Sequence, residues 1–236
     1  MSKALIIGAN SDIAFEFCKI LSANKYSLIL ASRNMAELHN KKKYLENFYK
    51  INCKIYYLDI EKFNSLENFI HNLDKDVNLA FLSTGYLEKN EVNKKKIENV
   101  NYYGPKKIIE NLLLNKNFKK LKHVVAISSV AADRKKILNN TYALSKKRLS
   151  QFLKDLSKKP FIENIIIKDI KPGYVLTKMT NNLSLSGPLI SSPSFVAKKI
   201  FKSLKTNKRE VYIPSYWKLI LIIYNLIPSI FLKSMN

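Results

Sequence analysis

Three residues, Ser129, Tyr142 and Lys146, have side chains and a spacing that can build a proton-transfer site. Tyr142 and Lys146 are four positions apart, so on a helix they share one face and the ammonium can lie beside the phenol. A neighbouring cation favours the phenolate and lowers the pKa of a tyrosine from about 10 toward neutrality. A phenol of this kind can give a proton to a carbonyl oxygen, or take one from an alcohol, at physiological pH.

The spacing of Tyr142 and Lys146 is weak evidence by itself, because the chain is rich in lysine. Tyr-x-x-x-Lys occurs at Tyr102/Lys106, Tyr103/Lys107, Tyr142/Lys146 and Tyr174/Lys178. Only Tyr142 has a serine thirteen residues before it, and Ser129 ends the apolar run His-Val-Val-Ala-Ile-Ser-Ser, which predicts a buried strand. Open α/β sheets hold ligands at the carboxyl ends of their strands, so this context selects Tyr142.

Apolar runs of strand length alternate with amphipathic segments along the chain. The apolar runs fall at 3–8, 26–31, 54–58, 77–82, 122–128, 163–170 and 210–213. The amphipathic segments fall near 11–23, 34–50, 62–73, 92–115, 140–158 and 193–206. Such alternation indicates right-handed crossovers and a sheet covered by helices on both faces. We predict an α/β fold, a Rossmann-type doubly wound parallel sheet of about seven strands with a C-terminal apolar helical tail.

Length and composition indicate one globular domain, with 47% apolar and 25% charged residues in 236. No linker or repeat interrupts the chain, so we predict a catalytic domain over 1–213 and an apolar extension over 214–236. Cys18 and Cys53 show no disulfide or metal-ligand spacing, which indicates core thiols, a reduced compartment and no metal. The first apolar run is too short for a signal peptide, so a cytoplasmic protein is expected.

The formal net charge of +23 raises the question of a nucleic-acid or membrane partner. The lysines are scattered rather than gathered in one stripe, and Lys, Asn, Ile and Tyr are all abundant, as AT-rich coding produces. We therefore expect no nucleic-acid partner. A basic exterior still suits anionic substrates or a lipid surface.

The turn Ile7-Gly8-Ala9-Asn10-Ser11-Asp12-Ile13-Ala14 joins the first predicted strand to a helix. Dinucleotide-binding folds hold a pyrophosphate here, where the helix N-terminus offers backbone N–H donors and positive dipole character. Gly8 suits the tight turn, and Asn10 and Ser11 can hold phosphate or ribose oxygens. Gly-x-Gly-x-x-Gly is absent, so a glycine that only turns the chain is the alternative interpretation.

The end of the second predicted strand bears on the choice of cofactor. An acidic residue there would bind a ribose 2′-hydroxyl and repel a 2′-phosphate. The sequence has Ser32 and Arg33 instead, and a guanidinium forms charge-assisted hydrogen bonds with phosphate. This favours NADP(H), with NAD(H) as the second choice and an ordinary surface arginine as the alternative interpretation of Arg33.

Together these residues resemble the short-chain dehydrogenase/reductase family over nearly the whole chain. Gly8–Ala14 is similar to the Gly-rich cofactor turn of that family, and Pro172–Thr177 is similar to the segment that borders the nicotinamide. Leu82–Gly85 stands in the place of the family's Asn-Asn-Ala-Gly segment. Asp59 matches the aspartate at the adenine ring, and Asn101 matches the helix asparagine of the proton relay.

The resemblance implies an NADP(H)-dependent oxidoreductase that interconverts a ketone and a secondary alcohol by hydride transfer. In it, Tyr142 exchanges the proton, Ser129 binds the substrate oxygen, Lys146 lowers the tyrosine pKa and holds the nicotinamide ribose, and Asn101 anchors a relay water. The resemblance also implies a homodimer or homotetramer. It places cofactor contacts at Gly8, Asn10, Ser11, Asp12, Ile13, Ser32, Arg33, Asp59, Ile60, Thr84, Gly85, Tyr142, Lys146, Pro172, Gly173, Val175 and Thr177.

Two features depart from the family pattern. Asp12 and Ala14 replace glycines of the cofactor turn, and an aspartate is electrostatically unfavourable beside a pyrophosphate. We expect Asp12 to cap the helix N-terminus, with its side chain turned away from the phosphates. The Asn-Asn-Ala-Gly segment keeps only its final glycine, Gly85, which removes no catalytic group.

A narrower resemblance bears on the substrate. Ser128–Arg134 and the following Asn140-Thr141-Tyr142 resemble the branch that reduces a keto-sugar on a polyprenyl phosphate, which includes the reductase partner in decaprenylphosphoryl-arabinose synthesis. The alternatives are a small soluble ketone or acyl-ketone and, in a different functional class, a non-catalytic NADP-binding regulator. Such regulators commonly lose the tyrosine or the lysine, and both are present here.

Two segments beside the predicted site have open interpretations. The segment 179–192, with Gly187 and Pro188, is either a mobile lid over the substrate or a surface loop. The apolar stretch 216–232 is too short for a confident membrane span, and it contains Asn225 and Pro228. It is a monotopic membrane contact through 214–233, a wall of the substrate pocket or dimer interface, or plain core packing.

Overall fold

Seven parallel strands form the central sheet in the part of the chain that the computed structural model describes, which is residues 2–88, 90–115, 117–134, 140–160, 164–181, 187 and 189–227. Their order across the sheet is β3-β2-β1-β4-β5-β6-β9, with the crossover between β1 and β4. This confirms the predicted doubly wound fold. The strands are β1 (Lys3–Ile7), β2 (Ser27–Ser32), β3 (Cys53–Tyr57), β4 (Leu79–Leu82), β5 (His123–Ile127), β6 (Ile166–Pro172) and β9 (Glu210–Ile213).

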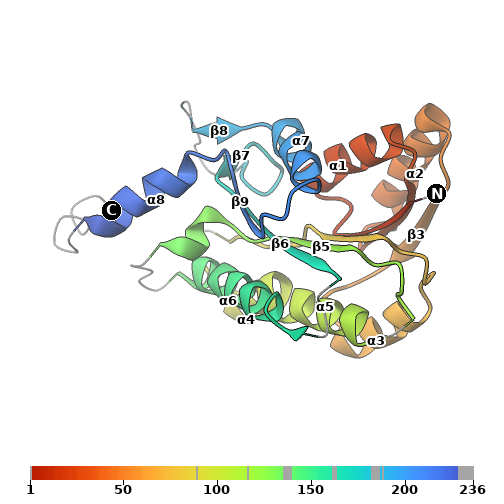
Figure 1. Ribbon diagram of the computed structural model, residues 1–236, viewed down its shortest axis with the longest axis horizontal. Helices are drawn as coiled ribbons and strands as arrows, with labels where there is room; N and C mark the ends of the chain where they lie inside the picture. The colour runs from red at the N-terminus through yellow and green to blue at the C-terminus, as the bar shows by residue number, and fades with distance from the viewer. Residues whose placement is uncertain are drawn as a thin grey trace.

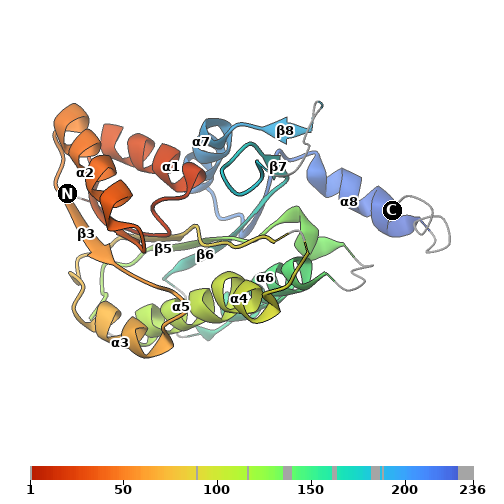
Figure 2. The same ribbon diagram turned by 180° about the vertical axis from the view of Figure 1, so that it is seen from behind.

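Helices cover both faces of the sheet, as Figures 1 and 2 show. Alternating strand residues supply two cores: Ala4 and Ile6 of β1 pack on one face, and Leu5 and Ile7 on the other. One face carries α1 (Asp12–Ala23), α2 (Met35–Tyr49) and α7 (Pro193–Ser203). The other carries α3 (Phe63–His71), α4 (Lys94–Glu98), α5 (Gly104–Leu114) and α6 (Thr141–Leu156). Cys18 and Cys53 are buried free thiols within the first of these layers.

The strand register brings several predicted site segments to one edge of the sheet. Ile7 pairs with Leu82, Leu82 with Ala126, and Ile127 with Ile170. The residues that directly follow these strands therefore emerge side by side at the carboxyl edge, on either side of the crossover between β1 and β4. That edge is where an open α/β sheet holds its ligand.

The predicted amphipathic segment 92–115 is a single helical path with a π-helical turn inside it. The π turn, Asn99–Tyr103, lies between α4 and α5 and contains the buried Asn101. Gly104 follows at a close approach, because a Cβ there would lie 2.4 Å from the Ile60 side chain. Single π turns inside α-helices are frequent at functional sites.

The C-terminal helix α8 (Trp217–Leu226) projects beyond the sheet (Figures 1 and 2). Its inner face is buried, since Trp217 and Leu221 form a small core with Val130. A two-stranded parallel sheet of β7 (Tyr174–Val175) and β8 (Ile190–Ser191) lies nearby. Across the described residues, no helix combines the length and the hydropathy needed to cross a membrane. The domain boundary at residue 213 stays a prediction.

Candidate active site

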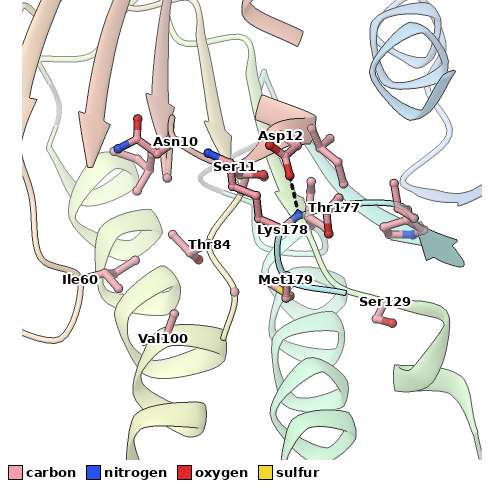
Figure 3. A pocket seen from close by; sticks show the side chains of 18 of the residues that line it. Asn10, Ser11, Asp12, Ile60, Thr84, Val100, Ser129, Thr177, Lys178 and Met179 are labelled. Atoms are coloured by element: carbon pink, nitrogen blue, oxygen red, sulfur yellow. Dashed lines mark hydrogen bonds between the residues drawn. The ribbon is translucent and has the colours of Figure 1, made fainter. Parts of the chain in front are cut away.

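A cavity of about 310 Å³ lies at the carboxyl edge of the sheet (Figure 3). It extends from the turn after β1 to the first turns of α6. The structure brings most of the predicted site residues to its wall: Gly8, Asn10, Ser11, Asp12, Ile13, Ser32, Arg33, Ile60, Thr84, Gly85, Ser129, Tyr142, Lys146, Pro172, Gly173, Val175 and Thr177.

The turn after β1 has a conformation that requires glycine at position 8. Gly8 has φ +75°, and a Cβ there would lie 2.7 Å from the backbone oxygen of Ser83. Ser11 is the N-cap of α1, and its hydroxyl accepts a hydrogen bond from the Ala14 N–H at 3.5 Å. The Ser83 hydroxyl donates to the Ser11 hydroxyl at 2.9 Å, which joins the turn to the end of β4. The turn thus presents a helix N-terminus to the cavity, as anion binding requires.

Asp12 does not cap α1, so that prediction is wrong. Ser11 already fills the cap position, and Asp12 is the first residue of the helix. Its carboxylate accepts a hydrogen bond from the backbone N–H of Lys178 at 2.7 Å, shown dashed in Figure 3. The Lys178 ammonium pairs with Glu37 of α2 at 2.8 Å. Both contacts hold the segment after β7 in place beside the cavity. Asp12 therefore has a structural role that a glycine at this position could not fill.

The wall around α1 fits a nucleotide bearing phosphate. The side-chain oxygen Oδ1 of Asn10 is buried and has no hydrogen-bond partner among the described residues, while its amide donates to the Asn34 carbonyl at 2.9 Å. A buried acceptor of this kind suits a ribose hydroxyl, because an unpaired buried polar atom is unfavourable. Arg33, at the far end of the cavity, has a half-exposed side chain, and its one ion pair within the described part of the chain is a long one with Glu61, at 3.5 Å.

Ser129 and Tyr142 meet at the other end of the cavity. Ser129 follows β5 in an extended conformation, and its hydroxyl oxygen accepts the N–H of Ala131 at 3.1 Å. The Ser129 side chain also acts on Tyr142, whose pKa it lowers. Tyr142 lies in the first turn of α6, where Glu91 accepts the N–H groups of Thr141 and Tyr142 at 2.9 and 3.2 Å. The helix start, and with it the phenol, is therefore fixed by a carboxylate.

The effect of Lys146 on Tyr142 differs from the prediction. Burial raises the pKa of Tyr142, and the Ser129 side chain only partly opposes this. The Lys146 ammonium is buried and donates to the backbone oxygens of Thr84 at 3.1 Å and Ile127 at 3.0 Å. Burial also lowers the pKa of Lys146 to about 8. In this arrangement desolvation outweighs any help from the cation, so the predicted lowering of the tyrosine pKa is wrong here.

Two predicted residues do not line the cavity. Asn101 is fully buried, and its carboxamide is held by the backbone of Tyr86, accepting its N–H at 3.0 Å and donating to its oxygen at 2.8 Å. The side chain of Asp59 accepts the N–H of Glu61 at 3.2 Å. The roles of Asn101 in a proton relay and of Asp59 at an adenine ring stay predictions.

Other lining residues were not among the predicted catalytic and cofactor-binding residues. Ser83 could have been found, because it directly follows a predicted strand beside the one that ends at Ile7. Met179 is the first residue of the predicted lid 179–192, and it lines the cavity, with its Cε 2.8 Å from where a Cβ on Gly85 would lie. Of the predicted lid 179–192, residues 182–186 and 188 lie outside the described residues, so its motion stays a prediction.

Known proteins share this architecture. Residues 2–186 match the sequence profile of the family described as short chain dehydrogenase. An NADP-dependent 3-hydroxy acid dehydrogenase of Schizosaccharomyces pombe is 26% identical over 190 residues, covering 75% of this chain and 72% of that protein. A short-chain dehydrogenase from Sphingobium yanoikuyae in complex with NADPH superposes with TM-score 0.82 at 12% identity, covering 92% of this chain and 89% of its own. An alcohol dehydrogenase from Thermococcus sibiricus complexed with 5-hydroxy-NADP gives TM-score 0.76 at 19% identity, covering 90% and 95%. The chain belongs to the short-chain dehydrogenase/reductase family.

Proposed function

We propose that this protein interconverts a ketone and a secondary alcohol with NADP(H), using Tyr142 as the general acid and base. One observation carries the proposal: Ser129, Tyr142 and Lys146 line the same cavity as the nucleotide turn of residues 8–13. A group bound along that turn can therefore reach the phenol. Membership of the family supports the same chemistry.

Each side chain has a distinct part in this reaction. NADPH, when bound, supplies the hydride. Tyr142 gives its proton to the carbonyl oxygen in the reducing direction and takes it back in the oxidising direction. Ser129 donates a hydrogen bond to that oxygen and stabilises its developing negative charge. Lys146 holds the nicotinamide ribose, and its charge favours the phenolate, while Asn101 anchors the water that returns the proton.

The test is NADPH consumption with a panel of small ketones, acyl-ketones and polyprenyl-phosphate keto-sugars. Consumption that depends on a ketone and on Tyr142 supports the proposal. Tight NADPH binding without turnover of any member would instead favour the non-catalytic regulator. Gel filtration with light scattering tests the homodimer or homotetramer that we also propose.

Arg33 is proposed to select NADPH over NADH through the 2′-phosphate. Its guanidinium is half exposed and weakly paired, so it is available to the phosphate. Arg33→Gln is expected to raise the KM for NADPH about 10-fold, because a charge-assisted hydrogen bond is lost. The KM for NADH should stay the same. If the substitution changes the KM for NADPH and the KM for NADH equally, Arg33 does not select between the two cofactors.

A lipid-linked keto-sugar is the substrate class that we propose first. The support is an outward stripe on α8, beside the cavity, made of Leu219, Ile222, Ile223 and Leu226, which are 51–74% exposed. These residues recur at i, i+3, i+4 and i+7, so they form one continuous apolar face. A basic protein with such a face suits peripheral contact with an anionic membrane, where a polyprenyl-phosphate substrate resides.

Removing the stripe should abolish binding to vesicles. In flotation with phosphatidylglycerol-containing vesicles, we expect the wild type to float and Ile222→Gln/Leu226→Gln to remain at the bottom. Phe48→Gln/Tyr57→Gln is the matched control, because these two exposed aromatic side chains belong to α2 and β3, at the opposite end of the molecule from α8 (Figure 1). If the α8 variant floats with the vesicles, or if the wild type does not float, a small soluble ketone is favoured as the substrate.

A further inference from the structure

Ser129 lies between two segments that are both held by buried charged side chains. Ser128, before it, is 1% exposed, and after it Val130–Asp133 form one 3₁₀ turn. Ser129 is the N-cap of this turn, and Asp133 is its last residue. The position of the serine hydroxyl thus depends on what fixes the two ends of a very short segment.

The residue before Ser129 is fixed by Asp169 of β6. The Ser128 hydroxyl donates to Oδ1 of Asp169, and the Ser150 hydroxyl of α6 donates to Oδ2 at 2.6 Å. Asp169 is 4% exposed, and it also forms an ion pair with Lys171 at 3.6 Å. One buried carboxylate therefore joins the strand before the serine to the helix that carries Tyr142.

The far end of the 3₁₀ turn is fixed by Lys171. This ammonium is 2% exposed and donates to both carboxylate oxygens of Asp133 at 2.9 Å. Glu210 of β9 is its third acidic neighbour, at 3.1 Å, and is itself 45% exposed. The Tyr212 hydroxyl donates to Asp133 Oδ2 at 2.7 Å. Charged hydrogen bonds in a buried setting are strong and directional.

Helix α8 holds the same turn from outside. The Asn225 amide donates to the backbone oxygen of Asp133 at 2.9 Å, and Trp217 and Leu221 pack on Val130. Trp217 also lies against Gly173 of the cavity wall, where a Cβ would be only 1.9 Å from its Nε1. The 3₁₀ turn is thus enclosed by β6, β9 and α8, with Asp133 as their common partner.

We propose that Asp133 is a positioning residue that fixes the Ser129 hydroxyl for the reaction by anchoring the 3₁₀ turn to Lys171, Tyr212 and α8. This rests on the proposed carbonyl chemistry at Tyr142. Asp133 touches no reacting atom. Its loss should therefore act through Ser129 alone and should leave the nucleotide end of the cavity intact.

The test is a double-mutant cycle on NADPH-dependent ketone reduction. Asp133→Asn is expected to lower kcat about 30-fold with the NADPH dissociation constant unchanged, because a displaced donor no longer meets the substrate oxygen. In the Ser129→Ala background, Asp133→Asn should lower kcat less than about 3-fold, because the side chain through which Asp133 acts is already absent. The matched control is Asp74→Asn. Like Asp133, Asp74 pairs with lysine, in its case with Lys3 and Lys54 at the opposite end of the sheet. The kcat of this variant should stay at the wild-type value.

Tyr212→Phe provides a milder variant if Asp133→Asn folds poorly, because it removes one hydrogen bond to Asp133 and keeps the ion pair. A separate readout is the pH profile of alcohol oxidation. The Ser129 side chain lowers the pKa of Tyr142. Displacing the serine should therefore move the pH profile of either variant to higher pH, in the same direction as is expected for Ser129→Ala.

Two results would overturn the role of Asp133: equal losses in the wild-type and Ser129→Ala backgrounds, or wild-type kcat and pH profile in both Asp133→Asn and Tyr212→Phe. A wild type that reduces no ketone, or a Tyr142→Phe protein as active as the wild type, would overturn the proposed function instead.

Discussion

Replacing Tyr142 with phenylalanine is expected to lower kcat for NADPH-dependent ketone reduction about 1,000-fold. General acid catalysis typically contributes 10²- to 10⁴-fold, and phenylalanine keeps the ring while removing the proton donor. The ring should still fill its place in the first turn of α6, because Glu91 holds that turn through backbone N–H groups. Initial rates under saturating NADPH measure the effect.

The control for Tyr142→Phe is cofactor affinity. The nucleotide turn lies at the other end of the cavity, so the fluorescence-detected dissociation constant of NADPH should change far less than kcat. Tyr103→Phe is a matched substitution, since Tyr103 also precedes a lysine by four positions but does not line the cavity. A Tyr142→Phe protein with wild-type kcat would remove the phenol from the mechanism.

Lys146→Met is expected to lower kcat/KM about 100-fold, because it removes the buried cation that, in the proposed mechanism, favours the phenolate and holds the ribose. Methionine fills similar space without charge. The KM for NADPH should rise as well, which separates this variant from Tyr142→Phe. Lys147→Met is the neighbouring control, since Lys147 is exposed and does not line the cavity. A Lys146→Met protein with unchanged kcat/KM would contradict the role of the ammonium.

The burial of Lys146 also predicts a pH dependence of stability. Its pKa is lowered from 10.5 to about 8 by desolvation. Between these values the unfolded chain binds more protons than the folded chain, so stability rises with pH across that window, and the full penalty is present below it. The unfolding free energy of wild type minus that of Lys146→Met, measured in urea on cofactor-free protein, should rise from pH 8 to 10.5. If this difference in unfolding free energy stays constant with pH, the pKa of Lys146 is not lowered by burial.

The fold could be predicted because its pattern is local and repeated. Buried parallel strands are continuous apolar runs, and each predicted run became a strand of the main sheet. Ser129 and Tyr142 could be matched because a strand end and a helix start bring them to one cavity. The exact role of Asp12 could not be predicted, because its partner Lys178 is 166 residues away and the contact exists only in the folded chain.

The buried charges behind Ser129 escaped prediction for a related reason. Charged side chains are mostly exposed in proteins, and nothing in Lys-Asp-Ile-Lys-Pro marks Asp169 and Lys171 as exceptions, yet both are buried in β6. Their burial depends on Asp133, Glu210 and Tyr212, which come from distant segments. The pKa of Tyr142 was also misjudged, because neighbour spacing predicts a nearby cation but gives no measure of desolvation.

The most direct measurement is transfer of deuterium from NADPH labelled at C4 to a ketone that the enzyme reduces. The proposed chemistry predicts an alcohol carrying one deuterium on its carbinol carbon by mass spectrometry, with the label lost from only one face of the nicotinamide. The Tyr142→Phe protein should form this product at the same position about 1,000-fold more slowly. An unlabelled alcohol, or labelled product formed equally fast by the variant, would contradict hydride transfer assisted by Tyr142.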